Sequence, residues 1–130
     1  FAHIYLDAAR MPRQVMLQWH DGSWEHRAYW GENLIPWGTD NTVSRQYMGP
    51  LPPPGRWVRL EVPAATVGVE GRIVDGMAFT LFDGTATWDR AGKRALQPVS
   101  SGETDIVAPA LLFTGGTVDF TGVIDPAIGA

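Results

Sequence analysis

Glycine and proline interrupt this chain too often for long helices to form. Its 130 residues include 15 Gly and 10 Pro, which weaken a helix interior by about 1 and about 3 kcal/mol per residue. The segments between these interruptions are short and rich in Val, Ile, Thr and aromatic residues, which favour strands. The sequence therefore predicts an all-β fold, and the length predicts one domain.

Short strands and tight turns alternate along the chain. We expect strands at 2–6, 15–19, 24–30, 56–62, 73–82, 85–89, 106–114 and 117–124. His20-Asp21-Gly22-Ser23 predicts a hairpin turn and Asp83-Gly84 a second one, because Asp and Gly tolerate the positive φ of such turns. Residues 31–55 contain a proline cluster that cannot join a strand ladder, so they are expected to form one long surface connection.

Charge and hydropathy exclude several classes of partner. The chain has 14 acidic and 10 basic residues, a net charge of -4, and Lys93 as its only lysine, so it lacks the basic surface that nucleic-acid binding needs. No apolar run approaches the roughly 20 residues of a membrane-spanning helix. The absence of Cys excludes thiolate catalysis, zinc–thiolate sites and disulfides.

Tryptophan is concentrated in one part of the sequence. Four of the six Trp residues, at 19, 24, 30 and 37, fall in the first hairpin and the start of the long connection. Strand alternation places Trp24, His26, Ala28 and Trp30 on one face and Glu25, Arg27 and Tyr29 on the other. The tryptophan face is the favoured core face, with the second face outward; the reverse arrangement would expose a row of indoles.

An exposed indole suits sugars, because its flat face stacks on the apolar C–H face of a pyranose ring. Trp37 lies between Pro and Gly in the long connection and is the expected exposed indole. The same segment supplies planar polar side chains that could orient sugar hydroxyls. Two plainer alternatives stay open: Trp37 folds back as a plug, and the polar residues only form turns. The candidate ligand-binding set is Trp37, Trp24, Tyr47, Asp40, Asn41 and Arg45.

Metal and catalytic motifs are sparse. The three histidines follow no metal-site spacing. Calcium is the better metal candidate, since the oxygen donors of Asp7, Asp21 and Asp89 suit a hard cation, although no Asp-x-Asp-x-Asp loop is present. The sequence has no Gly-x-Ser-x-Gly, no phosphate-binding loop and no carboxylate pair marked as buried, so neither an enzyme nor another cofactor is expected.

Three stretches resemble a known bacterial module. They are Met16-Leu-Gln-Trp-His-Asp-Gly-Ser-Trp-Glu-His-Arg-Ala-Tyr-Trp-Gly31, Gly55-Arg-Trp-Val-Arg-Leu-Glu-Val-Pro-Ala64 and Asp75-Gly-Met-Ala-Phe-Thr-Leu-Phe-Asp-Gly-Thr-Ala-Thr-Trp-Asp-Arg-Ala-Gly92. The chain resembles β-sandwich accessory modules of large secreted or surface proteins of planctomycetes and related bacteria, and of some rearrangement-hotspot-type repeat proteins. It is also similar to galactose-binding-like jelly rolls, the fold of many carbohydrate-binding modules.

The resemblance implies an antiparallel β-sandwich of jelly-roll type at 1–94, lacking the family's first strands. The tail at 95–130 is expected to supply extra strands or to lead to a neighbouring domain. The tail or a neighbouring chain would then cover the open sheet edge that the missing strands leave. The expected core is Val15, Leu17, Val58, Leu60, Val62, Ile73, Met77, Phe79 and Leu81.

The resemblance and the aromatic residues together predict a non-catalytic carbohydrate-binding or adhesion module of an extracellular bacterial protein. Its partner would be a carbohydrate or a neighbouring domain or subunit of the same assembly. The alternative is a structural subunit joined to its partners by β-strand addition through an open edge and the apolar tail.

Overall fold

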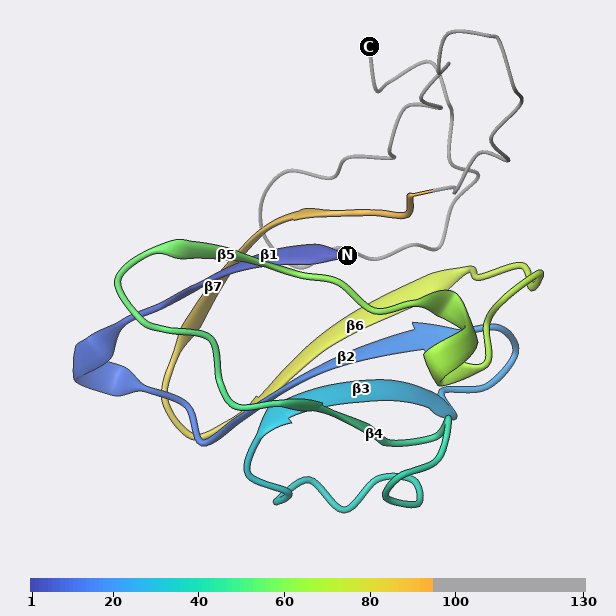
Figure 1. The fold of residues 1–130 in the computed structure, drawn as a ribbon, viewed down its shortest axis with the longest axis horizontal. Coiled ribbons are helices and arrows are strands. Elements are labelled where there is room, and N and C mark those ends of the chain that lie inside the picture. The colour runs from blue at the N-terminus through green and yellow to red at the C-terminus, as the bar shows by residue number, and fades with distance from the viewer. Residues whose placement is uncertain (95–130) are drawn as a thin grey trace, which may run out of the picture.

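The computed structural model describes residues 1–94, which form seven strands in two sheets (Figure 1). The elements are β1 (Ala2–Leu6), η1 (Ala8–Arg10), β2 (Gln14–His20), β3 (His26–Gly31), β4 (Gln46–Gly49), β5 (Trp57–Leu60), η2 (Ala64–Val67), β6 (Gly76–Phe82) and β7 (Ala86–Ala91). The two helices are short 3₁₀ turns, and within the described residues no helix is long and apolar enough to cross a membrane. The all-β prediction is confirmed, whereas the tail and its expected strands lie outside the described residues.

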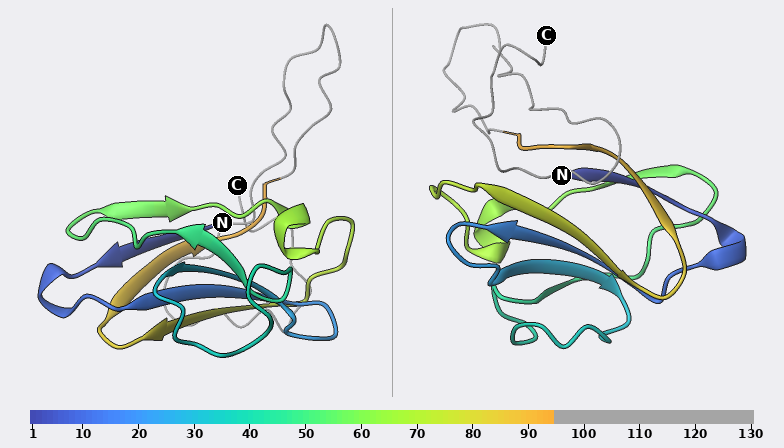
Figure 2. Two further views of the ribbon diagram at one scale, coloured as in Figure 1. Left: turned by 60° about the horizontal axis from the view of Figure 1, so that its bottom comes forward. Right: turned by 180° about the vertical axis from the view of Figure 1, so that it is seen from behind.

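Two sheets stack as the layers of a β-sandwich-like domain (Figure 2). One sheet has the strand order β5-β1-β7 and the other has the order β4-β3-β2-β6. All pairs are antiparallel except β3 with β4, which are parallel. The second sheet is therefore mixed, whereas the sequence predicted only antiparallel pairing. Strand β1 lies in the middle of its sheet, so the edges among residues 1–94 belong to β5 and β7 in one sheet and to β4 and β6 in the other.

The core fills the space between the sheets with the inward side chains of alternating positions. Of the expected core residues, Val15, Leu17, Leu60 and Met77 are buried, and Val58, Val62, Phe79 and Leu81 are partly buried against them. Ile73 was wrongly placed in the core: its exposed fraction is 88%. The reason is that β6 begins only at Gly76, so Ile73 belongs to the irregular segment before the strand.

The first predicted hairpin is confirmed, and the second is wrong. Strand β2 pairs with β3 across the turn, but β6 pairs with β2 while β7 pairs with β1 in the other sheet. Asp83 and Gly84 have φ of 58° and 61° and pass the chain between the sheets. This corner hydrogen-bonds to the β1–β2 connection, with Thr85 N–H donating to the Arg10 carbonyl at 2.9 Å. The β6–β7 corner and the β1–β2 connection therefore pass side by side from one sheet to the other.

The long connection between β3 and β5 contains β4, a strand that the proline-rich composition concealed. Tyr29 of β3 pairs with Tyr47 of β4. A parallel pair needs a connection of about a dozen residues to bring the chain back to its starting end. Residues 32–45, which we call the covering loop, make that return, and they pass over the outer face of the four-stranded sheet.

Candidate functional site

The covering loop buries an outer sheet face that alternation alone would leave in water. The face consists of side chains from β2 and β3 that point away from the core: Gln14, Met16, Gln18, Arg27 and Tyr29, all of them buried. Met16, Tyr29 and Ile35 of the loop form a small apolar cluster of their own. Arg27 and Tyr29 lie on the face of β3 opposite the core residues Ala28 and Trp30, as predicted, but the loop forms a third layer over them, so they are buried and not exposed to water.

Buried polar side chains of the sheet hold the covering loop in place. Gln14 Oε1 accepts hydrogen bonds from the backbone N–H groups of Leu34 and Ile35 at 2.7 and 2.8 Å. Tyr29 Oη donates to Asp40 Oδ1 at 2.8 Å. Arg27 Nη1 donates to the Ser44 carbonyl at 3.0 Å. Since these bonds come from residues fixed in strands, the loop takes one position over the sheet.

Tyr29 should titrate well above the ordinary range of a tyrosine. Burial, followed by its hydrogen bond to Asp40, raises the pKa of Tyr29 to about 12, from an ordinary value near 10. A raised folded-state pKa stabilises the fold below the unfolded pKa, and this stabilisation is lost as pH rises from about 10 through 12. A near-ultraviolet absorbance titration should show a late step that Tyr29→Phe removes. A titration in which Tyr29→Phe removes no step above the ordinary tyrosine range would contradict this assignment.

Arg27 is the centre of a polar network on the buried face. Its Nε donates to Gln18 Oε1 at 2.8 Å, and Nη1 and Nη2 donate to the two carboxylate oxygens of Glu25 at 3.2 and 3.1 Å. Gln18 Nε2 in turn donates to Thr80 Oγ1 of β6 at 2.8 Å. The hydrogen bond from Arg27 holds the pKa of Glu25 below its usual range. The network therefore links β2, β3 and β6 across one face of the sheet.

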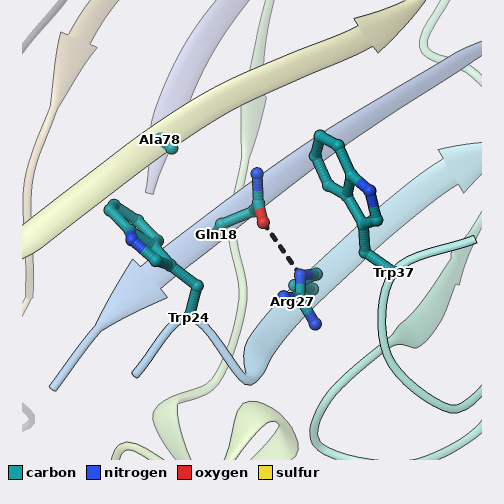
Figure 3. A pocket seen from close by; sticks show the side chains of 5 residues that line it. All are labelled: Gln18, Trp24, Arg27, Trp37 and Ala78. Atoms are coloured by element: carbon teal, nitrogen blue, oxygen red, sulfur yellow. Dashed lines mark hydrogen bonds between the residues drawn. The ribbon is translucent and has the colours of Figure 1, made fainter. Parts of the chain in front are cut away.

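Two tryptophans flank this network and form an open cleft (Figure 3). The cleft has a volume of about 360 Å³, and its lining residues are Gln18, Trp24, Arg27, Trp37 and Ala78. Trp24 and Trp37 are 40% and 49% exposed, and Gln18 and Arg27 lie between them as the floor. Ala78 of β6 completes the lining with a small side chain. We call this site the tryptophan cleft.

The β2–β3 turn positions Trp24. The ring of Trp24 lies against that of His20, with ring centroids 5.0 Å apart. Trp24 also approaches Gly76 so closely that a Cβ at position 76 would lie 3.2 Å from Trp24 Cη2. Glycine at position 76 therefore provides the room that the indole occupies.

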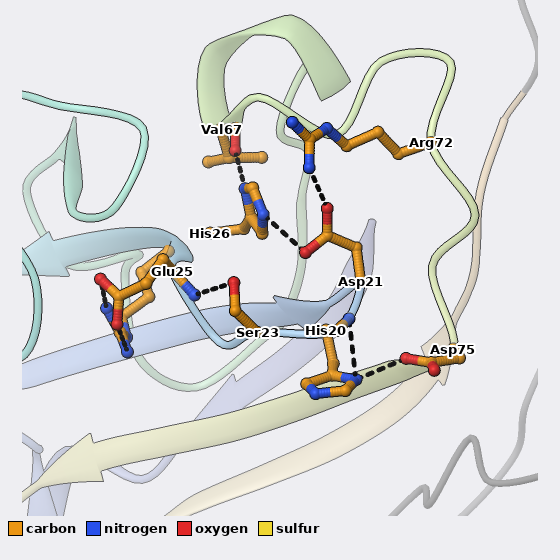
Figure 4. A network of polar contacts seen from close by, with 10 residues as sticks. His20, Asp21, Ser23, Glu25, His26, Val67, Arg72 and Asp75 are labelled. Atoms are coloured by element: carbon orange, nitrogen blue, oxygen red, sulfur yellow. Dashed lines mark hydrogen bonds and ion pairs between the residues drawn. The ribbon is translucent and has the colours of Figure 1, made fainter.

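A second polar network fixes the same turn (Figure 4). The buried His26 ring contacts the Val67 carbonyl through Nδ1 at 2.6 Å and Asp21 Oδ1 through Nε2 at 2.9 Å. Asp21 also pairs with Arg72, which holds the pKa of that carboxyl below its usual range. His20 Nδ1 contacts Asp75 Oδ1 at 2.5 Å. These contacts tie the turn that carries Trp24 to η2 and to the segment before β6.

The predicted ligand-binding residues lie in three places in the structure. Trp24 and Trp37 come together in the tryptophan cleft. Tyr47 is exposed on β4, where its ring lies 5.3 Å from that of Tyr29. The three polar candidates serve the covering loop: Asp40 accepts from Tyr29, Arg45 Nη1 donates to the Ile35 carbonyl, and Asn41 takes a turn conformation with a φ of 59°.

The cleft floor was missed from the sequence. Gln18 and Arg27 lie one residue away from core positions on their strands, so alternation correctly places them on the outer face. The position of the loop over them depends on contacts between distant residues, and composition does not reveal it. The clearest signal was Arg27 itself, a guanidinium within an aromatic strand segment.

The calcium candidates are engaged elsewhere. Asp7 accepts from the Ala9 N–H at the start of η1, Asp21 joins the His26 network, and Asp89 accepts from the Arg90 N–H. Residues 1–94 contain no group of three or more His, Cys, Asp or Glu side chains placed to hold a metal ion. The described part of the chain therefore gives the calcium expectation no support.

No family model, curated protein or solved structure matches this chain. Within residues 1–94, the tryptophan cleft is the feature that points to a function. Its two half-exposed indoles and its planar polar floor are the features to explain.

Proposed function

We propose that this chain is a non-catalytic carbohydrate-binding or adhesion module, and that sugars bind in the tryptophan cleft. The observation that carries the proposal is the pair of exposed indoles on either side of a floor made by Gln18 and Arg27. Indole faces stack on the C–H faces of a pyranose, while amide and guanidinium N–H groups donate to its oxygen atoms. Such a floor orients a sugar between its two aromatic walls.

The lining favours binding over reaction. The five described lining residues include no carboxylate, histidine or hydroxyl that could act as an acid, a base or a nucleophile. The cleft volume of about 360 Å³ lies near the lower end of ligand sites, which span roughly 300–1,000 Å³. A site of this size suits one or two sugar rings with modest affinity. From the sequence resemblance we also propose that the sandwich is a jelly roll. On the same basis we propose that the chain belongs to an extracellular bacterial protein.

Removing either cleft indole should weaken glycan binding by tenfold or more. Central aromatic contacts commonly contribute about 2 kcal/mol or more to binding, whereas the loss of a half-exposed side chain should change unfolding by less than about 1 kcal/mol. The test measures binding of wild type, Trp24→Ala and Trp37→Ala to a glycan array and to insoluble polysaccharides. Calorimetry on any hit gives the affinity, and urea unfolding gives the stability.

Trp57→Ala is the matched control. Trp57 is 49% exposed, as is Trp37, but it lies on β5 in the other sheet. We expect this variant to bind like the wild type. Loss of binding in Trp57→Ala with the cleft variants unaffected would place the site on the other sheet. A wild-type chain that binds no glycan and elutes from a sizing column as a concentration-dependent oligomer would instead favour the structural subunit joined by strand addition.

A further inference from the structure

The floor of the tryptophan cleft holds N–H groups that other residues leave free. Arg27 carries five N–H donors; the Nε donor is used by Gln18, both Nη1 donors by Glu25 and Ser44, and one Nη2 donor by Glu25. One Nη2 donor therefore has no partner within the described residues. Gln18 Nε2 uses one of its two donors on Thr80 and likewise keeps one. The floor thus offers N–H donors to the oxygen atoms of a ligand.

Glu25 neutralises the charge of this floor. Its carboxylate binds the guanidinium of Arg27 through both oxygens, at 3.1 and 3.2 Å. Because Arg27 holds the pKa of Glu25 below its usual range, the carboxylate stays ionised at neutral pH. None of the four other lining residues carries a charge. The cleft therefore offers hydrogen-bond donors without a net positive charge.

From this arrangement we infer that the cleft selects uncharged pyranoses over acidic sugars, and that Glu25 is the specificity-determining residue. The inference rests on the proposed function and names its ligand class. The hydroxyls of a neutral sugar accept from the free donors at no electrostatic cost. The carboxylate of a uronic acid would approach the same donors beside the carboxylate of Glu25, and two like charges at a binding site repel each other strongly.

Glu25 can be changed without disturbing the core. Its side chain is 59% exposed and pairs with Arg27, which lines the cleft. Glu25→Gln keeps one oxygen for Arg27 and removes the charge, so the guanidinium becomes an uncompensated cation. The chain also contains a matched control, since Glu61 pairs with Arg59 at 2.7 Å, is 54% exposed and has the same spacing of two residues. That pair lies at β5, in the other sheet.

The experiment measures the affinities of wild type, Glu25→Gln and Glu61→Gln for a neutral oligosaccharide and its uronic acid counterpart, at low and high salt. We expect the wild type and Glu61→Gln to prefer the neutral sugar by about tenfold or more. Glu25→Gln should bind the uronic acid about tenfold more tightly than the wild type does, and salt should reverse that gain. Its affinity for the neutral sugar should stay within about threefold, since the donors remain.

The outcomes separate the two proposals. A wild type that binds neutral and acidic sugars equally, or prefers the acid, would overturn the role of Glu25 and leave the carbohydrate-binding function standing. The same holds if Glu25→Gln keeps the wild-type preference. A wild type that binds none of these sugars would overturn both. A change of preference in Glu61→Gln as large as that in Glu25→Gln would show a general charge effect and also overturn the role of Glu25.

Discussion

Gly38→Ala should lower the free energy of unfolding by about 3 kcal/mol. Gly38 lies in the covering loop at a φ of 78°, where an L side chain costs about 1–2 kcal/mol. A Cβ there would also lie 2.3 Å from the Ser44 carbonyl oxygen and 2.8 Å from Arg27 Nη1. Because the first of these contacts is backbone, the loop must move to make room. That movement breaks the hydrogen bond between Arg27 and Ser44, which adds about 1–2 kcal/mol.

The control for this variant is Gly55→Ala. Gly55 has a φ of 79°, almost the same as that of Gly38, but a Cβ there would meet nothing within 4 Å. Gly55→Ala should therefore lower the free energy of unfolding by about 1 kcal/mol, which is only the cost of an L side chain at this φ. Urea unfolding with linear extrapolation measures both losses. Equal losses would show that the covering loop is not fitted closely onto Arg27. Since Trp37 is the residue before Gly38, the Gly38 variant should also bind glycans more weakly.

Arg27→Ala should cost about 3–4 kcal/mol of stability and abolish binding in the cleft. The change leaves the buried Oε1 of Gln18 and the Ser44 carbonyl without their donor. A buried polar group that loses its partner costs about 1–3 kcal/mol, and removal of the buried aliphatic stem adds to that cost. It also removes half of the cleft floor. If Arg27→Ala still folds, it should therefore bind the neutral sugar more weakly than the wild type does. It differs in this from Glu25→Gln, which should change only the preference between neutral and acidic sugars.

A surface arginine that also binds a glutamate through two hydrogen bonds is the control for Arg27. Arg13 also binds a glutamate through two hydrogen bonds, donating to Glu32 at 2.9 and 2.7 Å, but both partners are about half exposed. Exposed ion pairs contribute little to stability, so Arg13→Ala should lower the free energy of unfolding much less than Arg27→Ala does. The comparison uses the same urea measurement. Similar losses for the two arginines would contradict a central role for Arg27 in holding the covering loop.

The local parts of the fold could be predicted from the sequence because short segments encode them. The Asp-Gly turn after β2 has an antiparallel return strand, and the alternation around Val58 and Leu60 marks a strand with one inward face. Asp83-Gly84 is an equally good turn signal, yet it joins two different sheets. A turn sequence determines that the chain reverses direction at that point. It does not determine which strand will pair with the strand after the turn, because that depends on the packing of the whole sandwich.

The cleft could be predicted only in its aromatic part. The sequence predicts Trp24 and Trp37 as candidates because an indole face can stack on a sugar ring, and both are exposed in one cleft. Its floor could not be found in this way, because Gln18 and Arg27 acquire their role from a loop that returns over them to make a parallel strand pair. The polar loop residues were the more obvious candidates, but their side chains hold the loop.

The central place of β1 in its sheet has a consequence for the order of folding. Ala2 of β1 pairs with Leu60 on one side and with Ala91 on the other. Both partners therefore join β1 only by closing loops of more than 50 residues, which costs chain entropy before any contact forms. The β2–β3 hairpin needs no such closure and can form early. Because β6 also joins β2 only across more than 50 residues, the three-stranded sheet and the β2–β6 pair should both assemble after this hairpin has formed.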